Sequence, residues 1–338
     1  MFKEKKELYI RGKKFKSFGN VLIIGEIGSN HNHNLKKTFK LIDEAKKAGC
    51  DAVKFQLFRA NKIIQKKYPG WKILKKLELP VEWLSKLKNY AHKKKLFFSA
   101  TPFDIEAVKI LKKVNVDFYK VSSTEIEDVE MIKEIAKTRK SIILSTGAAN
   151  LSEISNSLEI LRNKKLKNIA LLHCVSIYPP EISQMNLNMI SSLKNAFHLP
   201  VGFSDHSMSL TIPAVAVAMG ACVIEKHITL SKKSKGPDHH FSLEPKELRL
   251  MVRGIREVEL SLGSKIKQPI IKNEKAGLAR RIISIKALQK NYKIKKEDCI
   301  IKRGNPNGIL PIDLNKIIGL TLKRRKKADQ EFKWSDFK

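Results

Sequence analysis

Eight short apolar runs recur along this chain, and each of them ends in polar or ionisable residues. They cover residues 21–28, 52–57, 96–100, 117–122, 141–145, 169–174, 201–204 and 222–227. The segments between the runs place apolar residues at helical spacing, as in Leu35–Ala48. Eight strand–helix units in series predict an α/β fold, a (β/α)₈ TIM barrel, in which catalytic side chains stand at the carboxyl ends of the strands.

The chain is longer than a barrel requires, because 338 residues exceed the roughly 250 of a typical example. Residues 58–79 form the longest insertion and follow the second strand, where they would contribute to an active-site rim. Later helices are expected at 81–93, 105–113, 129–137, 151–163, 187–197, 210–219 and 244–262.

The composition changes after the last expected barrel helix. Residues 264–279 are polar and lack helical periodicity, which is typical of a linker. From Arg280 onwards, short β-like runs at 281–287 and 299–302 alternate with turns such as 304–308. We therefore expect a barrel domain at 1–263, a linker at 264–279 and a small, mostly β domain at 280–338.

The formal net charge of +34 raises the question of a nucleic-acid partner. Lysine far outnumbers arginine, and the charges extend from Lys3 to Lys338 without gathering on one element. No aromatic interleaving or nucleic-acid motif accompanies them. We interpret the charge as solvated helix faces that would also attract anionic substrates, and we expect no nucleic-acid partner.

Targeting and membrane signals are missing from the sequence. The first six residues carry charges without a following apolar core, so they do not resemble a secretory signal. No apolar run approaches the roughly 18 residues that cross a bilayer. Because Cys50, Cys174, Cys222 and Cys299 are dispersed and form no CxxC pair, we expect reduced thiols in a cytoplasmic protein without a membrane partner.

Side chains capable of chemistry gather at the expected strand ends. The first six strands supply Glu26, Lys54, Gln56, Ser99, Thr101, Lys120, Ser122, Ser123, Glu125, Ser145, Thr146, His173 and Tyr178. The last two strands and the loop after them supply Ser204, Asp205, His206, His227 and Asp238.

The residue types suggest chemistry while leaving alternatives open. Two buried lysines among hydroxyls suit a small substrate with phosphate and carboxylate groups, although Lys54 also suits a Schiff base or a structural ion pair. His206 and His227, from adjacent strands, suit a divalent metal. Glu26 and Glu125 are the available carboxylate bases. For His31, His33, His239 and His240 no second partner for a metal site is visible, and they are interpreted mainly as loop residues.

Several short strings stand in order along nearly the whole chain. They are Glu26–His31, Val53–Gln56, Tyr119-Lys120 with Ser123 and Glu125, Leu144–Gly147, Leu172–Cys174, Ser204–His206, Glu225–His227 and Gly236–Asp238. Together they resemble the sialic acid synthase family, which makes nine-carbon nonulosonic acids from phosphoenolpyruvate and an N-acetylated amino sugar. The tail resembles the antifreeze-like (SAF) domain of that family, with Ala279–Arg281 at its start and Lys302-Arg303 near its turn.

The resemblance implies a role for each matching residue. It gives catalytic roles to Glu26, Lys54 and Lys120, and a divalent metal, with Mn²⁺ expected and Mg²⁺ or Co²⁺ as alternatives, to His206 and His227. It places phosphoenolpyruvate near Lys54, Thr101, Lys120, Ser123, Ser145 and Ser204, and the amino sugar near Gln56, Glu125, Tyr178 and Asp238. It also implies a domain-swapped homodimer in which Arg303 reaches the N-acetyl group of the sugar in the partner barrel.

Some positions depart from the pattern of the sialic acid members of that family. Ser176 and Trp71 stand where asparagine is frequent, and an aromatic residue at the rim would favour a deoxy sugar with less polar surface. Residues 304–306, Gly-Asn-Pro, replace the usual Arg-Pro-Gly order after Arg303. The product is therefore left open among N-acetylneuraminate, legionaminate and pseudaminate.

Three other functions compete with this one. A Schiff-base barrel aldolase would use Lys54 or Lys120 without a metal. A nucleic-acid-binding protein would explain the charge but not the ordered strand-end residues. A catalytically inactive barrel is disfavoured because Glu26, Lys54, Lys120, His206 and His227 are all present.

Overall fold

The computed structural model describes residues 7–264, 266–267 and 278–338. The chain divides into two compact units, Met1–Gly263 and Ser264–Lys338, which are described separately. Most of the expected linker, residues 265 and 268–277, lies outside the described residues.

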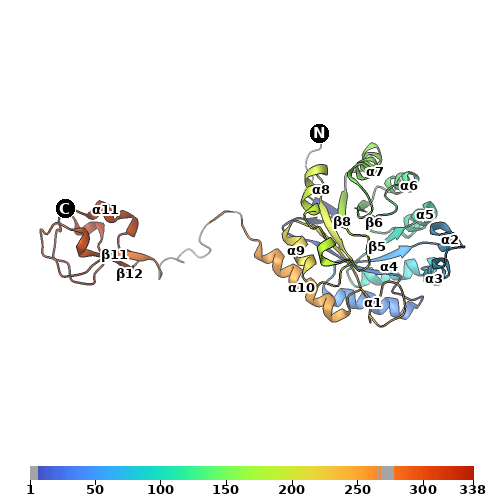
Figure 1. The fold of residues 1–338 in the computed structure, drawn as a ribbon, viewed down its shortest axis with the longest axis horizontal. Coiled ribbons are helices and arrows are strands. Elements are labelled where there is room, and N and C mark those ends of the chain that lie inside the picture. Colours follow the sequence, from blue (N-terminus) through green and yellow to red (C-terminus); the bar gives the residue numbers. More distant parts are fainter. Residues whose placement is uncertain (1–6, 265, 268–277) are drawn as a thin grey trace. The chain divides into compact units, whose positions relative to one another are not determined.

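The first unit contains a closed barrel of eight parallel strands, which confirms the predicted fold (Figure 1). The strands are β3 (Leu22–Gly28), β4 (Ala52–Leu57), β5 (Phe97–Pro102), β6 (Phe118–Val121), β7 (Ser141–Ser145), β8 (Ile169–Cys174), β9 (Val201–Asp205) and β10 (Val223–His227). Closure comes from β10, which pairs with β9 on one side and with β3 on the other. Nearly every strand residue is buried, as expected for parallel strands covered by helices.

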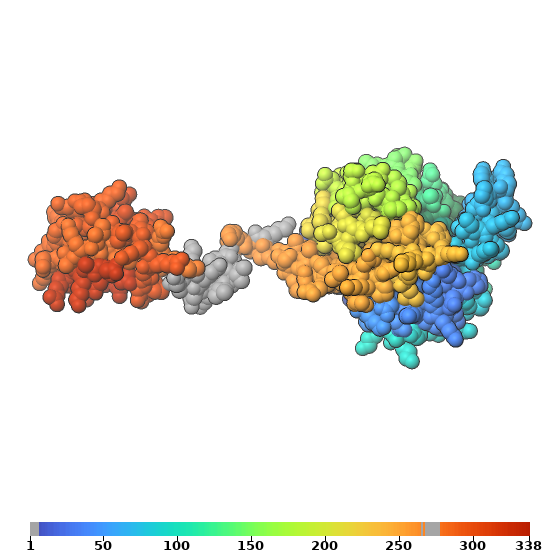
Figure 2. Space-filling view, turned by 60° about the horizontal axis from the view of Figure 1, so that its bottom comes forward, coloured from blue at the N-terminus to red at the C-terminus, as the bar shows by residue number. Residues whose placement is uncertain are grey.

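Helices alternate with the strands and surround them (Figure 1). They are α1 (Leu35–Ala48), α4 (Leu84–Lys93), α5 (Ile105–Val114), α6 (Val129–Lys137), α7 (Leu151–Asn163), α8 (Met189–Phe197), α9 (Ile212–Ala218) and α10 (Pro245–Ser261). The long helix α10 packs against α9 and α1 on one side of the barrel (orange in Figure 2). Within the described part of the chain, no helix has the length and apolar character needed to cross a membrane.

The helix ends follow the local sequence. Asn34 begins α1 by accepting a hydrogen bond from the Lys37 amide, and Gly49 ends it in the left-handed conformation that glycine adopts at no steric cost. Asn150 and Glu153 form a capping box at the start of α7. These capping residues mark the helix ends in the sequence, so the predicted bounds of α1 and α7 agree with the structure.

An amino-terminal hairpin, β1 (Glu7–Ile10) and β2 (Lys13–Lys16), was not among the predicted elements. Its residues Leu8, Ile10 and Phe15 are fully buried, each contributing about 1.5–3 kcal/mol through burial of apolar surface. They pack against residues near the amino ends of the barrel strands, including Leu22 and Phe118. The hairpin therefore covers the end of the barrel opposite the predicted active site.

The insertion at 58–79 folds into two short helices, α2 (Ala60–Ile63) and α3 (Gly70–Leu77). It forms a protrusion on the first unit (sky blue in Figure 2). The indole of Trp71 donates a hydrogen bond of 2.8 Å to Asn61 Oδ1, so this aromatic side chain is held within the insertion.

The second unit is small and partly β. Strands β11 (Arg280–Ser284) and β12 (Cys299–Arg303) pair antiparallel, and a short helix, α11 (Leu314–Ile317), follows. Its own core is built from the buried residues Ile282, Leu288, Ile294, Ile309, Ile317, Leu322, Phe332 and Phe337. A separate apolar core is consistent with the compact module expected from the sequence.

Candidate active site

The carboxyl ends of the barrel strands bring most of the predicted site residues to one cavity. Ten of the predicted residues line it: Lys54, Gln56, Thr101, Lys120, Ser123, Ser145, Tyr178, Ser204, His206 and His227. They come from β4, β5, β6, β7, β9 and β10 and from the loops after β6, β8 and β9, although they are spread over more than half of the chain.

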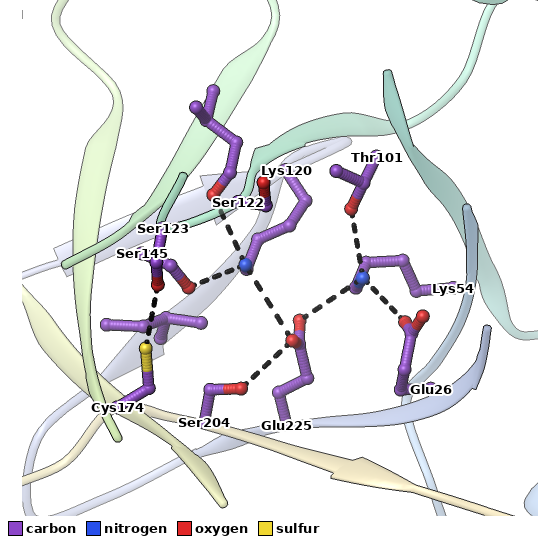
Figure 3. Close-up of polar contacts among 12 residues, drawn as sticks. Glu26, Lys54, Thr101, Lys120, Ser122, Ser123, Ser145, Cys174, Ser204 and Glu225 are labelled. Atoms are coloured by element: carbon purple, nitrogen blue, oxygen red, sulfur yellow. Dashed lines mark hydrogen bonds and ion pairs between the residues drawn. The ribbon is translucent and has the colours of Figure 1, made fainter. Parts of the chain in front are cut away.

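Two buried lysines form the centre of the cavity (Figure 3). Lys54 Nζ lies 2.6 Å from Glu26 Oε2 and donates a hydrogen bond of 3.0 Å to Thr101 Oγ1. Lys120 Nζ donates a hydrogen bond of 2.6 Å to Ser145 Oγ. Each ammonium group is thus aimed into the cavity by a hydroxyl or carboxylate from a different strand.

A second carboxylate, that of Glu225, connects the two lysines (Figure 3). Its carboxylate lies 3.8 Å from Lys54 Nζ and 3.7 Å from Lys120 Nζ, and it accepts a hydrogen bond of 3.1 Å from Ser204 Oγ. It is buried like the lysines. The site therefore holds two cations and two carboxylates away from bulk water.

Burial and neighbouring charges give the two carboxylates different pKa values. Burial raises the pKa of Glu26 to about 7; Lys54 opposes the rise and Glu225 adds to it. Burial also acts to raise the pKa of Glu225, but Lys120 and Lys54 outweigh it and lower that pKa to about 2. Near neutral pH Glu225 is the permanent anion and Glu26 exchanges its proton, which is the behaviour of a general acid or base.

The pKa values of the two lysines also shift in opposite directions. Burial lowers the pKa of Lys120 despite the nearby Glu225. Burial acts in the same direction on Lys54, but Glu225 and Glu26 reverse it and raise the pKa of Lys54. Lys54 is therefore the firmly charged member of the pair.

A tight turn after β7 supports the hydroxyl side of the cavity. Ser123 Oγ accepts a hydrogen bond of 3.0 Å from the Gly147 amide and lies 3.0 Å from Cys174 Sγ. A Cβ atom on Gly147 would lie 2.5 Å from Cys174 Sγ, so only glycine fits. The turn thus fixes Ser123 beside Ser145.

His206 and His227 stand together at the ends of β9 and β10, with ring centroids 5.5 Å apart. Burial lowers the pKa of both, and each histidine is therefore a neutral imidazole near neutral pH. His206 Nδ1 lies 2.8 Å from the Val175 carbonyl oxygen, which leaves Nε2 for a ligand. His227 Nδ1 is buried and has no hydrogen-bond partner among the described residues.

These features fit a divalent metal, because metals bind neutral imidazole nitrogens and the second nitrogen is commonly held by a carbonyl. Within the described ranges, no group of three or more His, Cys, Asp and Glu side chains is arranged around a metal position. Two histidines would therefore leave the remaining positions to substrate or water.

Asp238 reaches the same area from the loop after β10. Its Oδ2 accepts a hydrogen bond of 2.9 Å from Ser29 Oγ and lies 3.9 Å from His227 Nδ1. The next residue, His239, is buried between Thr229 Oγ1, at 2.6 Å, and Asn32 Oδ1, at 3.0 Å. His239 is therefore a structural anchor of this loop, in agreement with its interpretation as a loop residue.

Tyr178 lies at the edge of the cavity and is 51% exposed; its ring is tilted by 33° against that of His206, with ring centroids 4.2 Å apart. Two other predicted residues lie elsewhere. Glu125 accepts a hydrogen bond from Thr124 and does not line the cavity. Arg303 is exposed on β12 of the second unit.

Glu225 is the main site residue that sequence reasoning did not select. It stands two residues before His227 on the same strand, so strand alternation places both side chains on the same face. This two-residue spacing from His227 is the sequence signal that could have identified Glu225. Cys174 and Phe103, which also line the cavity, had no comparable signal.

The chain is similar to known proteins over most of its length. The NeuB family model matches residues 41–267, and the SAF domain model matches residues 280–338. N,N'-diacetyllegionaminic acid synthase from Campylobacter jejuni is 39% identical over 91% of this chain and 98% of that protein. Pseudaminic acid synthase from the same species is 32% identical over 95% of this chain and 96% of that protein.

A solved structure is similar over most of the chain. It is the N-acetylneuraminic acid synthetase from Leptospira borgpetersenii serovar Hardjo-bovis in complex with citrate, with a TM-score of 0.76 and 34% sequence identity. The match covers 80% of this chain and 94% of that chain.

Proposed function

Because the chain belongs to the NeuB family of nonulosonic acid synthases, we propose that it condenses phosphoenolpyruvate with an N-acetylated amino sugar, releasing phosphate. The observation that carries this proposal is the convergence of two buried lysines and two neutral histidines on one cavity. The product would be a nine-carbon nonulosonic acid. The enzyme would be a transferase.

The lysine half of the cavity suits phosphoenolpyruvate. Lys54 and Lys120 supply two positive charges, and Ser145, Thr101 and Ser204 supply directional hydrogen bonds. Glu225 keeps the lysines charged before the substrate anion arrives. The high net charge of the chain would raise the local concentration of such an anion.

The part of the cavity next to His206 and His227 suits the sugar. A divalent metal, Mn²⁺ by our proposal, held by His206 and His227 would act there as a Lewis acid that polarises the aldehyde of the open-chain sugar. Tyr178 and Asp238 lie beside the histidines, Gln56 lines the same cavity, and these three would orient the sugar hydroxyls and amide. Holding both substrates in one cavity supplies the proximity part of the rate gain.

The bond changes follow from these positions. The methylene carbon of phosphoenolpyruvate bonds to the sugar aldehyde carbon, and positive charge develops at the enol carbon. Water adds to that carbon and gives a proton to Glu26, whose Oε1 has no hydrogen-bond partner among the described residues. The C–O bond to phosphate then breaks as the new hydroxyl group loses its proton and becomes the keto oxygen. Phosphate leaves with the bridging oxygen, and the two protons of the water end on the former aldehyde oxygen and on phosphate.

For the sugar, we favour a 6-deoxy diacetamido substrate that leads to a legionaminate. Support comes from the similarity to the N,N'-diacetyllegionaminic acid synthase, at 39% identity. N-acetylmannosamine and the pseudaminate precursor are the alternatives. Arg303, delivered by the partner chain of a domain-swapped dimer, would bind the N-acetyl group in each case.

Isotope labelling, chelation and borohydride trapping test the chemistry. With ¹⁸O in the bridging position of phosphoenolpyruvate, the proposal expects the label in released phosphate, because the C–O bond breaks. It also expects that chelation abolishes turnover and that borohydride traps no adduct. Label retained in the sugar acid would instead show that the P–O bond breaks and would contradict the proposed step. A lysine adduct with chelator-resistant turnover would support a Schiff-base aldolase, in which imine formation releases the C2 oxygen as water.

A further inference from the structure

Two charged residues alternate with the site residues on the last two barrel strands. Asp205 lies between Ser204 and His206, and Lys226 lies between Glu225 and His227. Successive side chains on a strand point to opposite faces, so these two point away from the barrel interior. Both are nevertheless buried, at 0% and 1% exposure.

Asp205 and Lys226 lie directly opposite each other in the register of β9 and β10. Lys226 Nζ is 2.6 Å from Asp205 Oδ2 and also donates a hydrogen bond to the Ser207 carbonyl oxygen. Asp205 Oδ1 accepts a hydrogen bond of 2.8 Å from the Ser207 amide. The pair therefore binds both the amide and the carbonyl of the residue that follows His206.

We propose that the Asp205–Lys226 ion pair is a positioning device for the two histidines, fixing the turn that carries His206 against the strand that carries His227. The inference rests on the metal role given to those histidines in the proposed function. Asp205 and Lys226 do not line the cavity, so they act only through the residues they hold.

A purely structural role explains the pair less well. A buried ion pair is rarely the most stable choice, because well-packed apolar side chains of similar size often stabilise a protein as much or more. Here the charged groups also satisfy two main-chain groups of Ser207, which apolar side chains cannot do. The ion pair therefore fixes the main-chain orientation of Ser207, the residue directly after the candidate metal ligand His206.

Mn²⁺ binding to the full-length protein, measured by calorimetry with the metal alone, tests this inference. Residues that hold metal ligands in place typically change metal affinity by about 10–100-fold when mutated. Lys226→Met and Asp205→Asn should each weaken Mn²⁺ binding by about that factor. Phosphoenolpyruvate binding to the metal-free protein should change far less, because Lys54 and Lys120 stand on other strands and only Ser204, of the hydroxyl groups assigned to this substrate, lies on β9.

A matched control exists in the second unit, where Lys326 Nζ and Asp336 Oδ2 form another buried lysine–aspartate pair. Lys326→Met removes the same kind of ion pair far from the histidines in the sequence and should leave Mn²⁺ affinity unchanged. The double variant Asp205→Leu/Lys226→Met guards against simple misfolding, because it leaves no unpaired buried charge. It should fold and still bind Mn²⁺ weakly.

The outcomes separate the inference from the function on which it rests. Wild-type affinity in Lys226→Met, or in the folded double variant, would overturn the positioning role while leaving the metal site intact. His227→Ala is the reference for the site itself. If His227→Ala binds Mn²⁺ as tightly as the wild type, the metal site and the positioning role both fail.

Discussion

Replacing Glu225 with glutamine removes a negative charge from between Lys54 and Lys120 while keeping the shape of the side chain. The two contacts of 3.8 and 3.7 Å are each worth about 4 kcal/mol at an effective dielectric constant of about 20. The cost of burying a carboxylate offsets several kcal/mol of this sum. Breaking a buried charge pair by removing one partner usually costs about 3–5 kcal/mol, and we expect that loss for Glu225→Gln.

Thermal unfolding at pH 6, followed by the helical circular dichroism signal of the first unit, measures this loss. A domain of this size loses about 2–4 °C in Tm per kcal/mol, so Glu225→Gln should lower Tm by about 6–20 °C. Glu26→Gln is the matched control, because a pKa of about 7 leaves Glu26 mostly protonated and neutral at pH 6. The decrease in Tm caused by Glu26→Gln should be much smaller than that caused by Glu225→Gln. Equal losses in both variants, or wild-type stability in Glu225→Gln, would refute the assignment of the permanent charge to Glu225.

Three further changes probe individual roles. His227→Ala should abolish metal-dependent turnover, and near-normal steady-state rates would remove His227 from the metal site. Arg303→Ala should raise KM for the sugar by about tenfold or more, the loss expected for a hydrogen bond from a charged group, with KM for phosphoenolpyruvate unchanged. Equal rises for both substrates would argue against contact with the sugar alone. Because the deprotonated form of Glu26 accepts the proton, kcat/KM should rise with pH up to about 7 and then level off. The residual activity of Glu26→Gln should lack this rise, and an unchanged profile would exclude Glu26 as the base.

The barrel was predictable from sequence because its signal is local and repeated. Each strand is a short apolar run, and its side-chain alternation decides which residues enter the barrel, so Lys54 and Gln56 could be placed together from spacing alone. The same rule applied to β10 would have found Glu225 from the position of His227. That residue was missed although its signal was present.

Other features depend on partners that are distant in the sequence. The hairpin β1–β2 has lysines in its second strand and only Phe15 buried there, so no local pattern predicts that it covers the barrel. His239 bonds to Asn32, which is 207 positions away. The loops after β3 and β10 come together only in the closed barrel. The hydrogen bond between His239 and Asn32 therefore could not be predicted from sequence neighbours.

The central claim is a sugar-dependent condensation of phosphoenolpyruvate, and phosphate release tests it most directly. Purified protein with Mn²⁺ and phosphoenolpyruvate would be offered N-acetylmannosamine and the 6-deoxy diacetamido precursors of legionaminate and pseudaminate in parallel. The account predicts phosphate release that requires one of these sugars, with the legionaminate precursor used best. No release with any of them, from folded protein shown to bind Mn²⁺, would contradict the account.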